Sequence, residues 1–228
     1  MGCQVTETIV LDADGSGQIA IELHRVEQSY QQWAGEDYNK NEVFVDTTYV
    51  FDDFIAKYNQ TFSRLTPEDK AVFNAYKGVQ VQNKRNSYEK DFRTIISRKY
   101  KKIAEVPDLY RTERYASDII HNYALSAEED YYKVAFEYHD NHFKRVVTIT
   151  NPSIFKSEQE RLAQYQLELS KKKVFQKLTL SYSFFKEIKS VSVANALLSS
   201  DRKSVTISFG LIESLINPES TSVRIDFE

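Results

Sequence analysis

The chain has 228 residues with a net charge of −3, and 41% of them are hydrophobic. This charge lacks the positive field of a nucleic-acid-binding protein, so no nucleic-acid partner is expected. Few glycines and prolines and many aromatic residues exclude a disordered chain. The apolar runs are all shorter than the roughly 20 residues that a membrane-spanning helix needs.

The single cysteine, Cys3, is a candidate acylation site close to the first residue. Gly2–Cys3 fits the end of a bacterial lipobox, in which the acylated cysteine becomes the first residue of the mature protein. Met1–Gly2 followed by Thr6 also fits the N-myristoylation pattern, with Cys3 as a palmitoylation site. A third alternative is that Met1–Gly2 derives from a cloning vector, and the residues alone leave all three open.

Residues 5–23 predict a β-hairpin. Apolar residues alternate on both sides of a glycine-rich turn, in which Asp14–Gly15 and Gly17 are expected to supply positive φ angles. The turn also matches part of a calcium-binding loop, which places carboxylates at alternate positions before a glycine. The twelfth position of such a loop is Leu23 instead of an acid, and strands flank it in place of helices. We therefore predict a structural turn formed by Asp14, Gly15, Ser16 and Gly17, and no metal site.

The middle of the chain predicts helices separated by hairpins. A short helix is expected after Val26, a polar loop over 35–42 and a strand over 43–51. Paired helices follow, over 52–65 and 66–78, then a hairpin over 79–100 and a mainly helical segment over 103–123. A further hairpin is predicted over 132–149. Ser157 and Glu160 have the spacing of a capping box that would open a helix reaching about Ser170.

The last quarter of the chain, 174–227, contains four segments in which apolar and polar residues alternate. These segments are 178–184, 190–193, 205–209 and 223–227, and a short helix is expected over 211–217. Because successive side chains of a strand point to opposite faces, we predict an antiparallel sheet with one buried and one hydroxyl-rich face.

These elements predict an α+β fold: a mainly antiparallel sheet built from hairpins, with helices packed on one face. Residues 1–4 are interpreted as an anchor or cloning remnant, and residues 5–228 as a single domain.

Three segments resemble exported lipoproteins of Bacteroidota, whose functions are largely unknown. They are VTETIVLDADGSGQIAIEL at 5–23, VFVDTTYVFDDFIAKYNQTFSRLTPEDKAVF at 43–73, and IKSVSVANALLSSDRKSVTISFGLIESLINP at 188–218, followed by RIDF at 224–227. The resemblance implies a signal peptide upstream of Cys3, acylation of Cys3 and a lipid-anchored domain in the cell envelope. Phe185–Glu187 stands where such sequences often have a proline, which puts the turn there in doubt.

Catalytic motifs are absent from the sequence. It contains no nucleophile elbow, no phosphate-binding glycine pattern and no cofactor motif, so no cofactor is expected. His139 and His142 bracket a turn and could contribute to a zinc site, but no further ligand is identifiable, which favours a solvated turn. Two basic clusters, 98–102 and 171–173, are typical of solvated faces, with contact to anionic lipid heads as the alternative.

The leading hypothesis is a non-catalytic binding or scaffolding protein, anchored to the membrane through acylated Cys3. It is expected at the outer membrane, facing the periplasm, with an envelope protein or a small apolar ligand as partner. The alternative is a periplasmic carrier of a small apolar ligand or lipid, and an enzyme with dispersed carboxylates is a third hypothesis.

Overall fold

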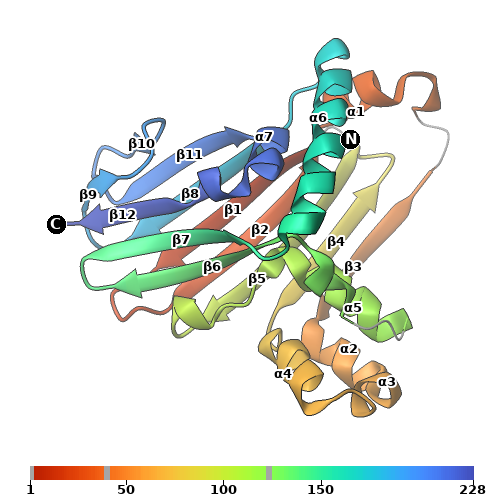
Figure 1. Cartoon of the computed structure of the whole chain (residues 1–228), viewed down its shortest axis with the longest axis horizontal. Helices are drawn as coiled ribbons and strands as arrows, with labels where there is room; N and C mark the ends of the chain where they lie inside the picture. The colour runs from red at the N-terminus through yellow and green to blue at the C-terminus, as the bar shows by residue number, and fades with distance from the viewer. Residues whose placement is uncertain (1–2, 39–41, 122–124) are drawn as a thin grey trace.

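The computed structural model describes residues 3–38, 42–121 and 125–228. Three short segments lie outside these ranges: Met1 and Gly2, part of the loop predicted over 35–42, and the last residues of the segment predicted as helical over 103–123. Figure 1 shows two sheets, the smaller in front of the larger, with helices around them.

The larger sheet has eight strands in the order β10-β11-β8-β1-β2-β5-β4-β3. The strands are β1 Cys3–Leu11, β2 Gly17–Arg25, β3 Phe44–Val50, β4 Gln80–Asn86, β5 Asp91–Tyr100, β8 Lys177–Phe184, β10 Leu197–Leu198 and β11 Ser204–Gly210. All neighbours pair antiparallel except β1 and β8, which are parallel. The first strand therefore lies near the middle of this sheet.

The smaller sheet has four strands in the order β6-β7-β12-β9. They are β6 Tyr132–His139, β7 His142–Ile149, β9 Ile188–Val191 and β12 Val223–Phe227, and all pair antiparallel. Buried apolar residues of both sheets belong to one hydrophobic cluster. The sheets consequently share a core.

The helices of the described residues are α1 Glu27–Ala34, α2 Phe51–Lys57, α3 Asn59–Ser63, α4 Pro67–Ala75, α5 Thr112–His121, α6 Pro152–Lys171 and α7 Leu211–Ile216. Short 3₁₀ turns cover Gly35–Asp37 (η1), Ile103–Glu105 (η2), Leu109–Arg111 (η3), Ser126–Glu129 (η4) and Pro218–Thr221 (η5). Aromatic rings of α2, α4 and α5 pack against one another, whereas α6 packs on α7. The predicted α+β class is confirmed, and no described helix is long and apolar enough to span a membrane.

The four segments of the last quarter do not form one sheet, contrary to the prediction. β8 and β11 pair in the larger sheet, whereas β9 and β12 pair in the smaller one. After Phe184 the chain crosses from the larger sheet to the smaller one, and it returns to the larger sheet at β10. Alternation assigns each strand a buried face, but it contains no information about which strand lies beside it.

Three local features also differ from the sequence predictions. Helix α6 begins at Pro152, because Asn151 Oδ1 accepts a hydrogen bond from Ile154 N at 3.1 Å, and Ser157 lies inside the helix. The first helix of the predicted pair is interrupted at Tyr58. Strand β1 begins at Cys3, so the predicted anchor segment over 1–4 overlaps the fold.

Candidate functional site

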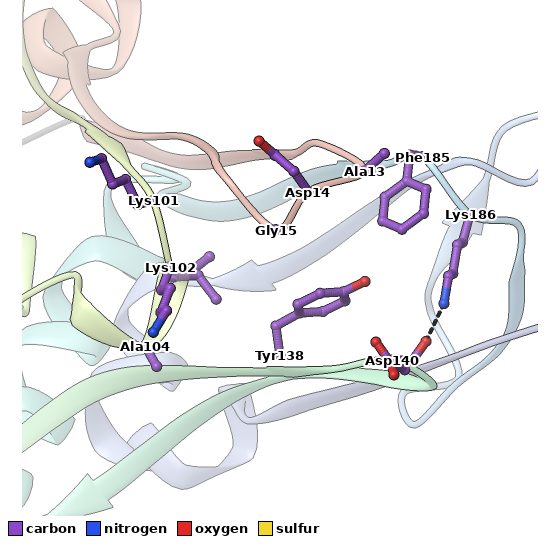
Figure 2. Close-up of a pocket in the computed structure, with 11 residues that line it drawn as sticks. Ala13, Asp14, Gly15, Lys101, Lys102, Ala104, Tyr138, Asp140, Phe185 and Lys186 are labelled. Carbon is purple, nitrogen blue, oxygen red and sulfur yellow. Dashed lines mark hydrogen bonds between the residues drawn. The ribbon is translucent and has the colours of Figure 1, made fainter.

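A cavity of about 460 Å³ opens where several connections meet at one end of the two sheets (Figure 2). Its walls come from the β1–β2 turn, the segment after β5, the β6–β7 turn and the β8–β9 connection. The lining residues are Ala13, Asp14, Gly15, Lys101, Lys102, Ile103, Ala104, Tyr138, Asp140, Phe185 and Lys186. Loops held by a rigid scaffold are a common location for binding residues.

The β1–β2 turn gives this cavity a rigid, charged rim. Asp12 N donates to Ser16 O at 2.8 Å, and Gly15 has a φ of +81°, a value that glycine adopts without strain. Ser16 Oγ and Ser16 N both donate to Asp14 Oδ1, at 2.6 and 3.0 Å, and these bonds lower the pKa of Asp14. The Asp14 carboxylate at the rim is therefore ionised at neutral pH.

Gly17 has a role different from the predicted one. It lacks a positive φ and instead starts β2, where a Cβ atom would lie 2.0 Å from Val10 O and 2.6 Å from the Tyr100 hydroxyl. Tyr100 Oη donates to Val10 O at 2.9 Å across the sheet. Close backbone approach is thus the reason for glycine at this position.

Two aromatic rings face the middle of the cavity from opposite sides, Tyr138 from β6 and Phe185 from the β8–β9 connection (Figure 2). Burial, and then the charge of Asp140, raises the pKa of Tyr138, so its hydroxyl stays protonated and can donate. Lys186 Nζ donates to the backbone oxygen of Asp140, which joins two of the walls.

Lys101 and Lys102 lie on the side of the cavity away from Lys186 (Figure 2). Ammonium groups attract anionic groups, and facing aromatic rings suit a flat apolar ligand. The arrangement can therefore bind a compact ligand that has both an anionic group and a flat apolar part.

Cys3 lies at the end of the larger sheet that is opposite the cavity. Cys3 pairs with Arg25, and Gln4 pairs with Lys177, whereas Leu11 pairs with Gly17 beside the cavity. At about 3.3 Å per residue, the nine residues of β1 separate the two ends by roughly 26 Å. A group attached to Cys3 would lie far from the cavity.

Exposed apolar and basic side chains gather at the Cys3 end. Phe175, which precedes β8, is 84% exposed; Phe44 at the start of β3 is 73% exposed, and Tyr88 in the β4–β5 turn is 78% exposed. The basic cluster 171–173 ends α6 here, and Lys172 Nζ donates to Trp33 O at 2.7 Å, which places α1 beside this end of α6 (Figure 1). The other basic cluster, 98–102, lies at the cavity end.

A buried polar network joins the two sheets. Arg145 Nε of β7 lies 3.0 Å from Glu7 Oε1 of β1, and the two side chains are 3% and 0% exposed. The hydroxyls of Tyr110 and Tyr182 donate to the Glu7 carboxylate, and Arg145 Nη1 donates to Thr221 Oγ1 at 2.9 Å. The network therefore connects β1, β7 and β8 to the η3 and η5 turns inside the core.

Sequence reasoning missed this network, although its two charged residues carried a signal. Glu7 lies between Val5 and Ile9 on the buried side of an alternating strand, and Arg145 lies between Phe143 and Val147 in the same way. A charge at an apolar position of a strand indicates a buried partner, because an unpaired buried charge is costly.

A second polar cavity, of about 480 Å³, lies near this network and is lined by Asp108, Arg111 and Arg114 among others. Burial raises the pKa of Asp108 to about 6. Asp108 Oδ2 accepts from Val134 N at 2.9 Å and Oδ1 accepts from Tyr110 N at 3.1 Å. Through these contacts Asp108 connects the start of η3 to β6.

Comparison with known proteins gives little further information. No family model matches the chain, and no curated protein matches it. Among solved structures, the NMR structure of the folded domain of LppM from Mycobacterium tuberculosis matches with a TM-score of 0.43 at 9% identity, covering 100% of this chain and 90% of that one. A similarity this distant transfers no function.

Proposed function

We propose that the protein is a lipid-anchored, non-catalytic binding protein of the cell envelope, of the kind that the Bacteroidota resemblance implies. Acylated Cys3 attaches it to the outer membrane on the periplasmic side, and the cavity at the far end of β1 binds the ligand. The observation that carries the proposal is that the two ends of the larger sheet differ: exposed aromatic residues and the 171–173 lysines lie at the same end as Cys3, and the cavity lies at the other end.

The Cys3 end has the composition of a surface that lies on a membrane. Aromatic side chains such as Phe175 enter the interfacial region, and lysines of the 171–173 cluster attract anionic lipid heads. The two acyl chains of a diacylglyceryl cysteine already anchor a protein stably, and these side chains add a second contact with the same surface.

The cavity end then faces away from the membrane. Tyr138 and Phe185 provide apolar walls. The lining lysines, Lys101, Lys102 and Lys186, outnumber the lining acidic residues, Asp14 and Asp140, which favours an anionic group. The ligand class that fits is a compact aromatic or otherwise flat molecule carrying a phosphate, sulfate or carboxylate.

The anchor is tested by the mass of the N-terminal peptide from protein made in its native host. The expected result is an acylglyceryl-modified Cys3 with Met1 and Gly2 removed. An unmodified peptide, or one with myristoylated Gly2, would overturn the envelope assignment and leave the cavity assignment standing.

The cavity is tested with phenyl phosphate as the probe, measured by calorimetry. Binding is expected to weaken at least several-fold in Lys102→Ala and in Tyr138→Ala, and to be unchanged in Lys133→Ala, an exposed lysine of β6 outside the cavity. Equal binding by all variants, or none by the unaltered protein, would refute this ligand class. Release of phenol from the probe would refute the non-catalytic role.

A further inference from the structure

The β6–β7 hairpin that supplies Tyr138 to the cavity presents three metal-ligating side chains on its other face. Glu137 and His139 are alternate residues of β6 and so share a face, and His142 pairs with His139 at the end of the ladder. The two histidines stand out in the sequence, but a third ligand does not. Glu137 was missed because its place beside them depends on the strand register.

The three side chains converge. Each offers a ligand atom, and these atoms lie within 4.8 Å of one another. The rings of His139 and His142 have centroids 4.8 Å apart with planes tilted by 35°. The strand scaffold therefore holds two imidazoles and one carboxylate at a distance that small side-chain rotations can close around one ion.

One nitrogen of the His142 ring makes no hydrogen bond to the described residues. His142 Nδ1 lies 2.8 Å from Asn141 Oδ1, whereas His142 Nε2 is buried and has no hydrogen-bond partner among the described residues. A second-shell oxygen on one nitrogen orients an imidazole so that the other nitrogen can bind a metal. The cost of burying an unpartnered nitrogen is removed when a metal ion occupies it.

We propose that Glu137, His139 and His142 form a binding site for a divalent transition-metal ion of the zinc class. Two imidazole nitrogens and a carboxylate oxygen are the donor set that zinc accepts in sites with three protein ligands, and water completes the coordination. The site is independent of the anchor and of the cavity ligand, because its ligands lie on the opposite face of the hairpin from Tyr138.

Nearby positively charged side chains lower the affinity of the site for a metal ion. Lys144 Nζ lies 3.1 Å from Glu137 Oε2, so the ammonium competes with a metal for the carboxylate. Asp226 pairs with His142 in the β7–β12 register, but Arg224 holds its carboxylate at 2.8 Å. These contacts predict moderate affinity, which removal of the Lys144 charge increases.

The test is a calorimetric titration of the whole chain with Zn²⁺, with the visible absorption of Co²⁺ as a second reading of imidazole ligation. One ion per chain is expected, with at least ten-fold weaker binding in His139→Ala and in His142→Ala. Weaker binding is also expected in Glu137→Gln, and several-fold tighter binding in Lys144→Gln.

His24→Ala is the matched control, because His24 lies on β2 near the Cys3 end and should not affect binding. Circular dichroism checks that each variant is folded. Absence of binding by the unaltered protein, or unchanged binding by the His139→Ala/His142→Ala double variant, would overturn the proposal. Tighter binding in Lys144→Gln together with weaker binding in Glu137→Gln identifies the carboxylate as a ligand even where a histidine variant folds poorly.

Discussion

Glu7 and Arg145 lie on different sheets and form an ion pair across the shared core, with 3.0 Å between Glu7 Oε1 and Arg145 Nε. They are separated by 138 positions in the sequence. Breaking a buried pair leaves one charge without a partner, so Glu7→Gln is expected to lower the free energy of unfolding by about 3–5 kcal/mol. Urea denaturation measures this loss.

The double variant Glu7→Met/Arg145→Met provides the control for that prediction. It removes both charges and keeps an apolar volume, so it is expected to be more stable than Glu7→Gln. Glu22→Gln, on the opposite face of the same sheet, should change stability little. A Glu7→Gln protein as stable as the unaltered chain would show that the pair is not what holds the sheets at this position.

Gly17 and Gly210 offer a matched pair of glycine-to-alanine substitutions. At Gly17 a Cβ atom would meet the backbone oxygen of Val10 at 2.0 Å, which cannot move without disturbing the sheet. At Gly210 the nearest atom is the carboxylate end of Glu213, which can rotate away. We expect Gly17→Ala to cost about 1–3 kcal/mol and Gly210→Ala clearly less, as measured by thermal unfolding. Equal costs would contradict the close approach at Gly17.

The raised pKa of Asp108 predicts that the free energy of unfolding depends on pH. Burial raises its pKa in the folded protein to about 6 from an ordinary value of 3.8. The folded state therefore holds this proton more tightly than the unfolded state. The resulting stabilisation is complete below about pH 4 and is lost as the pH rises through about 6.

The Asp108→Asn variant isolates this effect, because asparagine does not titrate. The stability of the unaltered protein minus that of Asp108→Asn is expected to fall between about pH 4 and pH 6 by an amount on the order of 3 kcal/mol, and to be flat above pH 7. Urea denaturation across this range measures the difference. A difference that is constant over the range would show that Asp108 is ionised throughout.

Vesicle binding tests the membrane-facing surface without the acyl chain. Replacing Lys171, Lys173 and Lys177 by glutamine is expected to weaken binding of unacylated protein to phosphatidylglycerol vesicles, because each lysine near an anionic surface contributes about 1 kcal/mol. Phe175→Ser is also expected to weaken it. Sedimentation with vesicles measures the bound fraction.

The matched control changes charge at the other end of the molecule. Lys101→Gln/Lys102→Gln alters the cavity end, roughly 26 Å away along β1, and should leave vesicle binding nearly unchanged. A similar loss in both sets of variants would mean that the attraction depends on overall charge and not on the Cys3 end.

Patterns among neighbouring residues were enough to predict the hairpins, most of the helices and the α+β class. The β1–β2, β4–β5 and β6–β7 hairpins were predicted because each consists of alternating residues beside a turn whose residues are adjacent in the chain. Helix α4 begins at Pro67, close to the start of the helix predicted over 66–78, because Thr66 caps it within one helical turn by accepting from Asp69 N. The turn at Asp14 and Gly15 depends on the same local chemistry.

The way in which these elements meet depends on contacts between residues that are distant in the chain. The parallel pairing of β1 with β8, the division of the last strands between two sheets and the pairing of Glu7 with Arg145 join residues far apart in the sequence. Alternation gives each strand a buried face but no neighbour, because many pairings bury the same apolar area. The cavity and the Glu137–His139–His142 cluster depend on those pairings and on strand register, so individual residues could be noticed in the sequence while the sites could not.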